Sequence, residues 1–228
     1  MMLETLKQIQ TKCYNELKTS GVKFKNGIPK INPNRMVKGN SKLDKSILIF
    51  DTLAGKNGTC KTDCYKCYAM KAQNQYSQTN LFRSINTELA KSSPEILKAL
   101  IIEQIKKSKG ITTIRLHSSG EFFSQEYINL WCDIIKMFPN LKFYTYTKRM
   151  NDFDFSEIKE QANFNLINSM VTLKSGDVVL NYGNDAQIEK LVEEGYRVCP
   201  ATKNAWKGIC GSDCNLCMIT DKVCFHIH

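Results

Sequence analysis

Apolar positions along the chain change repeatedly between helical and strand spacing. Residues 3–19 carry apolar side chains three or four positions apart, which is typical of one face of a helix. Short runs rich in β-branched and aromatic residues predict strands, and Ser or Pro before a periodic stretch with Gly or Pro after it predicts a helix. The expected strands are 46–55, 112–121, 142–149, 164–172, 177–183 and 196–202, and the further helices are 76–91, Ser93 to Gly110, Ser124 to Pro139, 155–162 and 185–194.

Strands that alternate with helices predict an α/β fold with right-handed crossovers and a mostly parallel sheet. About six strands are too few for a closed eight-stranded barrel, so we expect an open, partial β/α barrel. The expected organisation is an N-terminal helix and wrapping segment at 1–45, a barrel core at 46–203 and a cysteine-rich tail at 204–228. In such sheets ligands gather at the carboxyl ends of the strands.

The composition is that of an ordinary globular protein, with 42% apolar and 24% charged residues. No segment approaches the roughly 20 unbroken apolar residues of a membrane span, and the amphipathic, partly acidic amino end resembles neither a signal nor a transit peptide. We therefore expect a cytoplasmic protein with no membrane partner. The net charge of +10 favours a polyanionic partner such as nucleic acid, although lysine-rich chains are common where coding DNA is AT-rich.

Ten cysteines are unusual in a chain that we expect in a reducing compartment, where disulfides are rare. Eight of them lie in two clusters, which indicates metal binding. Cys13, on a helical pattern, and Cys132, in an apolar stretch, are expected to be packed core thiols.

The first cluster is the CxxxCxxC array of Cys60, Cys64 and Cys67, directly after the strand expected at 46–55. A structural zinc site or a closed iron–sulfur cluster uses four protein ligands. Three thiols leave one metal position open for another ligand.

The second cluster repeats this spacing at Cys210, Cys214 and Cys217, with Cys199 upstream. These four thiols are sufficient for a second iron–sulfur cluster or for zinc. Spare ligands follow, so the identity of the fourth ligand stays open; they are Cys224, His226 and His228. A metal here would stabilise a tail that has few apolar residues to bury.

The CxxxCxxC array after the first strand of a partial barrel resembles the radical S-adenosylmethionine superfamily. The resemblance implies a 4Fe-4S cluster on Cys60, Cys64 and Cys67, with S-adenosylmethionine on the fourth iron and Tyr68 near the adenine. The superfamily's Gly-Gly-Glu turn, which receives the amino group of the cofactor, corresponds here to Ser119, Gly120 and Glu121, with Ser in place of the first Gly and no Pro after it.

Further cofactor contacts are expected at strand ends. Asn168 and Ser169 resemble the polar pair that meets the ribose or the methionine carboxylate, and Lys148 or Arg149 could pair with that carboxylate. A polar turn and a charged loop are equally good interpretations. His117 is a candidate substrate contact, although a lone histidine is more often a satisfied core residue.

The chain from about residue 40 onward also resembles the phage and prophage family called gene product 88. The matching segments are LAGKNGTCKTDCYKCYAMKA, IRLHSSGEFFSQEYINLW, FYTYTKR and the cysteine-rich ending. Together the resemblances imply an enzyme that takes one electron from a donor, cleaves S-adenosylmethionine to a 5′-deoxyadenosyl radical and abstracts hydrogen from an unknown substrate. The basic charge and the phage context favour a nucleic acid or nucleotide as that substrate, and a peptide is the alternative. The alternatives are a zinc- or cluster-stabilised nucleic-acid-binding protein, and a redox sensor that has lost cofactor binding.

Overall fold

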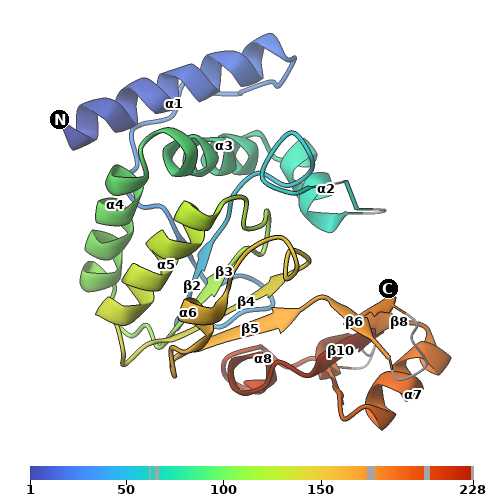
Figure 1. Cartoon of the computed structure of the whole chain (residues 1–228). Coiled ribbons are helices and arrows are strands. Elements are labelled where there is room, and N and C mark those ends of the chain that lie inside the picture. Colours follow the sequence, from blue (N-terminus) through green and yellow to red (C-terminus); the bar gives the residue numbers. More distant parts are fainter. Residues whose placement is uncertain (62, 65–66, 174–177, 203–205, 227–228) are drawn as a thin grey trace. The chain divides into compact units, whose positions relative to one another are not determined.

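The computed structural model describes residues 1–61, 63–64, 67–173, 178–202 and 206–226. Its main sheet is open and has the strand order β1-β2-β3-β4-β5 (Figure 1). The strands are β1 Val37–Lys38, β2 Ile47–Phe50, β3 Thr113–Leu116, β4 Lys142–Thr147 and β5 Phe164–Asn168. β4 pairs in parallel with both β3 and β5. The expected α/β class with an open, mostly parallel sheet is therefore confirmed, with five strands in this sheet rather than six.

The helices predicted from the sequence are present, with shorter ends in several cases. They are α1 Met2–Thr19, α3 Ser77–Ser92, α4 Pro94–Lys107, α5 Gln125–Met137, α6 Ser156–Lys159 and α7 Asp185–Glu193. Pro94 occupies the first turn of α4 and Ser124 caps α5 by accepting a hydrogen bond from the Tyr127 N–H, as expected. Among the described residues, two α-helices were not predicted, α2 Tyr68–Gln75 and α8 Leu216–Ile219.

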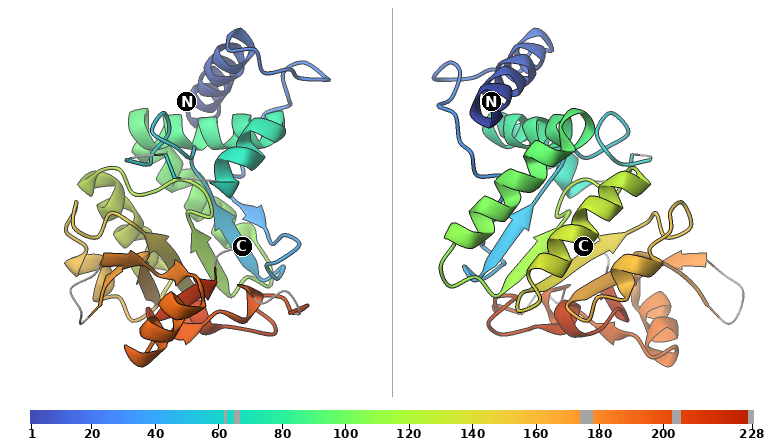
Figure 2. Two further views of the ribbon diagram at one scale, coloured as in Figure 1. Left: turned by 90° about the vertical axis from the view of Figure 1, so that its right-hand side faces the viewer. Right: turned by 60° about the vertical axis from the view of Figure 1, so that its left-hand side comes forward.

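The chain divides into two compact units that alternate along the sequence. The first comprises 1–37, 49–110 and 117–134. In it α3 contacts α1, α2 and α4, an arrangement visible in Figures 1 and 2. Its core includes the side chains of Phe50 and Trp131, whose ring centroids are 5.0 Å apart.

The wrapping segment of the first unit is held by buried polar contacts. Gln104 on α4 accepts hydrogen bonds from the backbone N–H groups of Arg35 and Met36, at 2.7 and 2.9 Å. The Arg35 side chain is itself buried and donates to Asn86 on α3. A segment that looks merely polar in the sequence is therefore fixed to two helices.

The second unit comprises 38–48, 111–116 and 135–228. Beyond β5, β6 Met170–Thr172 pairs antiparallel with β7 Val178–Leu180. A separate sheet has the order β8-β10-β9, formed by β8 Tyr182–Gly183, β10 Val223–His226 and β9 Arg197–Val198.

The strands expected at 177–183 and 196–202 are therefore not additional strands of the main sheet. β8 and β9 instead pair in parallel with β10, a strand that the sequence did not predict. β8 is short because Asn184 follows it directly and begins α7 with a capping box.

Within the described ranges, no helix has the length and apolar character needed to cross a membrane.

Candidate metal and cofactor site

A tight turn presents the first cysteine after β2. The N–H of Gly58 donates to the carbonyl of Gly55 at 2.9 Å, and the N–H of Cys60 donates to the same carbonyl at 3.3 Å. A Cβ on Gly58 would lie 2.2 Å from the carbonyl oxygen of Leu53, so only glycine fits there. The LAGKNGTC segment therefore folds into a turn that fixes where Cys60 leaves the strand.

The three thiols of the first cluster share one surrounding with Glu121. All three cysteines are half-buried. The pKa of Cys60 is raised to about 11, mainly by burial and to a smaller extent by the negative charges of Glu121, Cys64 and Cys67. The structure thus brings Glu121, from the loop after β3, within electrostatic reach of the cysteine array.

The loop 118–121 packs directly on the cysteine turn. Gly120 has a φ of +84°, and a Cβ there would lie 1.9 Å from the Thr52 hydroxyl oxygen and 2.7 Å from that of Thr59. The Glu121 N–H donates to the Thr59 hydroxyl at 2.8 Å. Position 120 therefore needs glycine both for its left-handed backbone and for the close approach of two threonines.

Tyr68 connects the third cysteine to the same loop. It is the first residue of α2, immediately after Cys67, and the residue is 68% exposed. Its hydroxyl donates to the carbonyl of Ser118 at 2.8 Å. The tip of the ring is thus fixed while its face stays open to a ligand.

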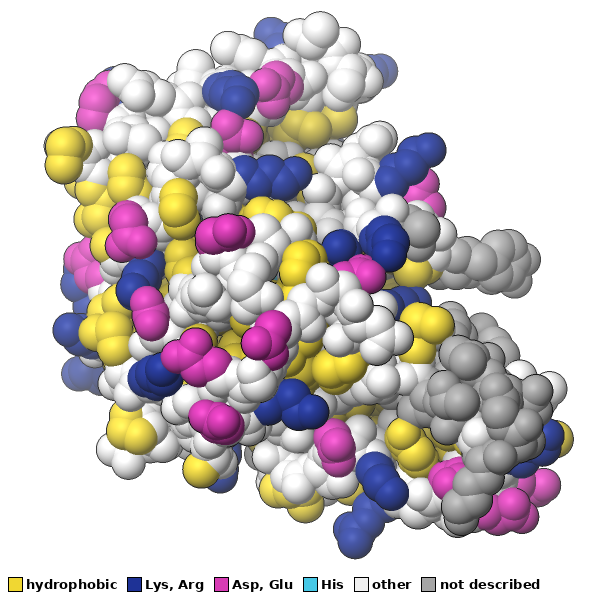
Figure 3. Space-filling view, viewed as in Figure 1, with side chains coloured by type: hydrophobic (Ala, Val, Ile, Leu, Met, Phe, Trp, Pro, Cys, Tyr) yellow, Lys and Arg dark blue, Asp and Glu magenta, His cyan; other side chains and the backbone are white. Residues whose placement is uncertain are grey.

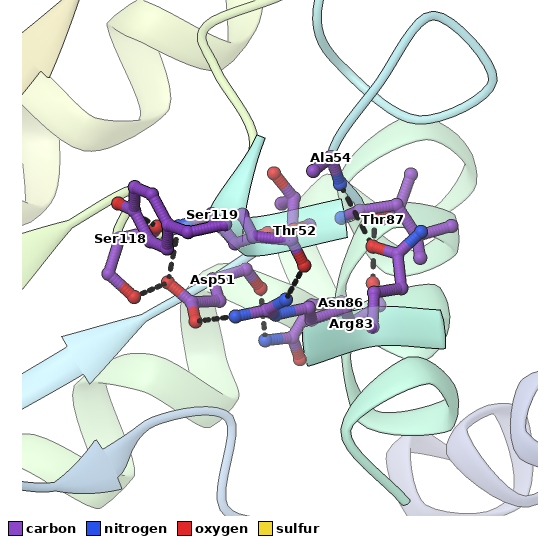
Figure 4. A network of polar contacts seen from close by, with 12 residues as sticks. Asp51, Thr52, Ala54, Arg83, Asn86, Thr87, Ser118 and Ser119 are labelled. Carbon is purple, nitrogen blue, oxygen red and sulfur yellow. Dashed lines mark hydrogen bonds and ion pairs between the residues drawn. The ribbon is translucent and has the colours of Figure 1, made fainter. Parts of the chain in front are cut away.

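A buried ion pair underlies both segments, and sequence reasoning missed it (Figure 4). Asp51 follows β2 and lies 3.0 Å from Arg83 of α3, with both side chains less than a tenth exposed. The other carboxylate oxygen accepts hydrogen bonds from the Ser118 hydroxyl and the Ser119 N–H, at 2.6 and 2.9 Å. The only signal in the sequence is an acid directly after an apolar strand.

His117 lies in the core and ends β3 with strained backbone. Its φ is +55°, which is uncommon for a residue other than glycine. The ring packs against Phe122 and its Nε2 lies 3.0 Å from the Tyr127 hydroxyl, while Nδ1 has no partner among the described atoms. Burial lowers the pKa of His117 to about 3, so the ring is neutral at physiological pH. These surroundings favour a structural role over substrate contact.

The remaining expected cofactor contacts belong to the second unit. Asn168 accepts a hydrogen bond from the Met170 N–H at 3.1 Å, and Ser169 is buried and joined through its N–H to the carbonyl of Thr147. Arg149 pairs with Asp152. Lys148, after β4, is exposed. The backbone contacts of Asn168 and Ser169 are those of a polar turn at a strand end, and their cofactor contacts stay predictions.

The second cysteine cluster gathers within the second unit. The pKa of Cys199 is raised to about 12, mainly by burial and to a smaller extent by the charges of Cys217, Cys210 and Cys214, which places the four thiols in one region. The backbone of Cys210 forms a bridge to Cys214. The Tyr146 hydroxyl lies 2.7 Å from the Cys217 sulfur.

Two features of the second unit help to hold this cluster. The Asn165 side chain on β5 donates to the carbonyls of Cys217 and Thr220, each at 2.8 Å, which anchors α8. The Arg115 guanidinium lies 5.7 Å from the centre of the Tyr146 ring, and its positive charge lowers the pKa of Cys217 against the larger effect of burial.

Two of the three spare ligands have side-chain surroundings other than the thiols of this cluster. Cys224 is fully buried in a separate apolar cluster with Leu173, Ile188 and Leu191. His226 places its Nδ1 3.1 Å from a carboxylate oxygen of Asp185. His228 lies outside the described residues. Cys199 is therefore the best-placed fourth thiol for the second cluster.

A known protein family matches the part of the chain that carries the first cysteine cluster. Residues 30–190, more than half of the chain, match the family described as gene product 88. The chain belongs to the gene product 88 family. The matched region contains the first cysteine cluster and loop 118–121, and it ends before Cys199. No curated protein and no solved structure is detectably similar to this gene product 88 protein.

The donor set of the gene product 88 protein can be compared with what a metal requires. As placed, no three His, Cys, Asp or Glu side chains in the described part of the chain converge closely enough to hold an ion. The donor chemistry of the first cluster nevertheless fits an iron–sulfur cluster with one open position, because the other two cysteines of that unit are core thiols. Cys13 is 3% exposed and Cys132 2%, which confirms their prediction.

Proposed function

We propose that this protein is an iron–sulfur enzyme of the radical S-adenosylmethionine type. Cys60, Cys64 and Cys67 would hold a 4Fe-4S cluster, and the cofactor would occupy the iron that no cysteine binds. The observation that supports this most strongly is the packing of loop 118–121 on the cysteine turn, with the Glu121 N–H bonded to Thr59 at 2.8 Å. A closed structural site would have no need of a second loop whose carboxylate acts electrostatically on its thiols.

The residues of the first unit have separate roles in this proposal. Gly120 lets backbone approach the ligand, and the Glu121 carboxylate accepts the ammonium group of the cofactor. Tyr68 offers its exposed ring to the adenine. When bound, the cluster and cofactor would use one electron from a donor to release methionine and a 5′-deoxyadenosyl radical, which takes a hydrogen atom from the substrate.

A second metal centre is proposed on Cys199, Cys210, Cys214 and Cys217. Its thiols act on one another's pKa, and Asn165 and Tyr146 fix the segment that carries Cys217. A second 4Fe-4S cluster would relay electrons or bind substrate, and zinc is the alternative metal. The open sheet is consistent with the partial barrel of the superfamily.

The rival proposal is a metal-stabilised protein that binds nucleic acid without chemistry. Its support is the net charge of +10. On the face that Figure 3 shows, Lys and Arg side chains are interspersed with Asp and Glu rather than gathered in one patch. That face gives less support to a dedicated nucleic-acid surface than to a general electrostatic preference for anionic substrates such as nucleotides, and a phage or mobile-element origin agrees with such a substrate.

The test is anaerobic purification with iron, sulfide and zinc analysis, followed by electron paramagnetic resonance of the reduced protein. We expect iron and sulfide in cluster amounts and a spectrum that shifts when S-adenosylmethionine is added. Glu121→Gln should weaken cofactor binding about tenfold and leave the iron content unchanged, because it removes one charged contact and no ligand. The matched control is Glu126→Gln, an exposed acid of the same unit.

Two results would contradict the proposal. The first is zinc in place of iron at the first cluster. The second is an iron signal that does not respond to the cofactor in the unaltered protein. Either one would leave a metal-stabilised binding protein or a redox sensor as the better account.

A further inference from the structure

We propose that Asp51 and Arg83 are positioning residues that connect loop 118–121 to the cysteine segment, the stretch between β2 and α2 that carries Cys60, Cys64 and Cys67. Through this connection, a ligand that orders one segment also orders the other. The coupled ordering rests on the proposed function, because it concerns a ligand that contacts both segments. The connection between the segments is a property of the protein alone and is tested without any ligand.

Asp51 uses both of its carboxylate oxygens at the start of the cysteine segment. One oxygen faces Arg83, with 3.0 Å between it and Nη2. The other accepts from the Ser118 hydroxyl at 2.6 Å and the Ser119 N–H at 2.9 Å (Figure 4). Next to it, Thr52 exchanges backbone and side-chain hydrogen bonds with Ser119. The loop after β3 is thus held by the residues that end β2.

Arg83 extends the same network to the far end of the cysteine segment. Its Nη1 donates to the carbonyl of Ala69 at 2.9 Å, in the first turn of α2 and two residues after Cys67. One guanidinium therefore connects the residue that opens the segment with the helix that closes it. The planar fork of arginine suits such a double contact, which lysine cannot reproduce.

Burial explains why this pair points to positioning rather than to stability alone. The side chains of Arg83 and Asp51 are 8% and 9% exposed. Buried ion pairs repay little of their desolvation cost, so apolar residues of the same volume would stabilise the unit at least as well. What the charged pair adds is direction, because one Asp51 oxygen accepts from loop 118–121 and Arg83 Nη1 donates to the first turn of α2. The Nε of Arg83 is without a partner among the described atoms, which agrees with a side chain placed for its two terminal nitrogens.

The ligand-free test is hydrogen–deuterium exchange of the whole protein. Asp51→Asn and Arg83→Lys should each raise the exchange rate about tenfold in peptides covering both the cysteine segment and residues 117–122, while peptides of α4 stay unchanged. Asp133→Asn is the matched control, because it breaks the exposed Lys98–Asp133 pair of the same unit. Ser118→Ala removes one donor to Asp51 and serves if the charged variants do not fold.

The second test adds S-adenosylmethionine. In the unaltered protein it should slow exchange in both segments. In Arg83→Lys it should protect one segment without the other and bind about tenfold more weakly, although the iron content is unchanged. If the pair only stabilised the fold, Arg83→Lys would lower stability, but S-adenosylmethionine would still slow exchange in both segments.

The outcomes separate this inference from the proposed function. A protein that neither holds iron nor binds the cofactor refutes the function, and ligand-free exchange then still decides the link between the segments. Faster exchange in both segments supports the inference. Faster exchange in only one of them, or an equal effect in Asp133→Asn, would overturn it.

Discussion

At the scale of single residues, Gly120 is the position where the backbone and its surroundings restrict the side chain most. Gly120 and Gly110 both have positive φ, +84° and +69°. Alanine at Gly110 meets nothing within 4 Å, whereas at Gly120 its Cβ would lie 1.9 Å from a Thr52 atom. We expect Gly110→Ala to cost about 1–2 kcal/mol and Gly120→Ala at least about 1 kcal/mol more, measured by denaturant unfolding. Equal costs would show that loop 118–121 is not packed on the cysteine turn.

His117 predicts a pH dependence of stability. Burial lowers its pKa from 6.5 to about 3, so between these pH values His117 is protonated in the unfolded chain and neutral in the folded protein. The contribution of the neutral ring is complete above pH 6.5 and is lost as the pH falls toward 3, by up to about 1.4 kcal/mol per pH unit. His117→Asn, which tolerates positive φ, should flatten the slope of unfolding free energy between about pH 4 and 6. An unchanged slope would mean that the ring is accessible to solvent.

At the scale of elements, periodicity identified most helices and the parallel order of β3, β4 and β5. It failed where one element is contacted from several sides. α3 packs against α1, α2 and α4, so polar residues such as Arg83 and Asn86 are buried although they lie off the apolar stripe. The Asp51–Arg83 pair was missed for that reason, because a pattern of apolar positions carries no information about which polar side chains meet.

The elements of the second half differ for another reason. β7, β8 and β9 are two or three residues long, and β8 and β9 depend on β10, which arrives from the end of the chain. Such short strands are specified by their partners more than by their own composition. The two cysteine clusters, in contrast, are predicted from residue type and local spacing alone, and as metal sites they stay predictions.

At the scale of the whole molecule, each cysteine cluster takes its thiols from one compact unit. Cys60, Cys64 and Cys67 belong to the first unit, and the four cysteines from Cys199 to Cys217 belong to the second. Each unit also contains buried cysteines outside its proposed ligand set, which are Cys13 and Cys132 in the first and Cys224 in the second. The chain therefore supplies a matched control for each proposed centre.

This arrangement predicts that the two centres lose metal independently. Cys64→Ala should remove the metal of the first centre, about half of the total if both hold 4Fe-4S clusters, and leave the second intact. Cys214→Ala should do the reverse. Cys132→Ala and Cys224→Ala should retain all of the metal, because those side chains pack in the core. The measurement is iron, sulfide and zinc per chain after anaerobic purification.

Two outcomes would change the assignment of ligands. Loss of the second metal in Cys224→Ala would make that thiol, rather than Cys199, the fourth ligand. Loss of all metal in Cys64→Ala alone would mean that cysteines of both units close a single site. A thiol from the second unit would then occupy the open position of the first cluster, and the position on which the proposed enzyme depends would not exist.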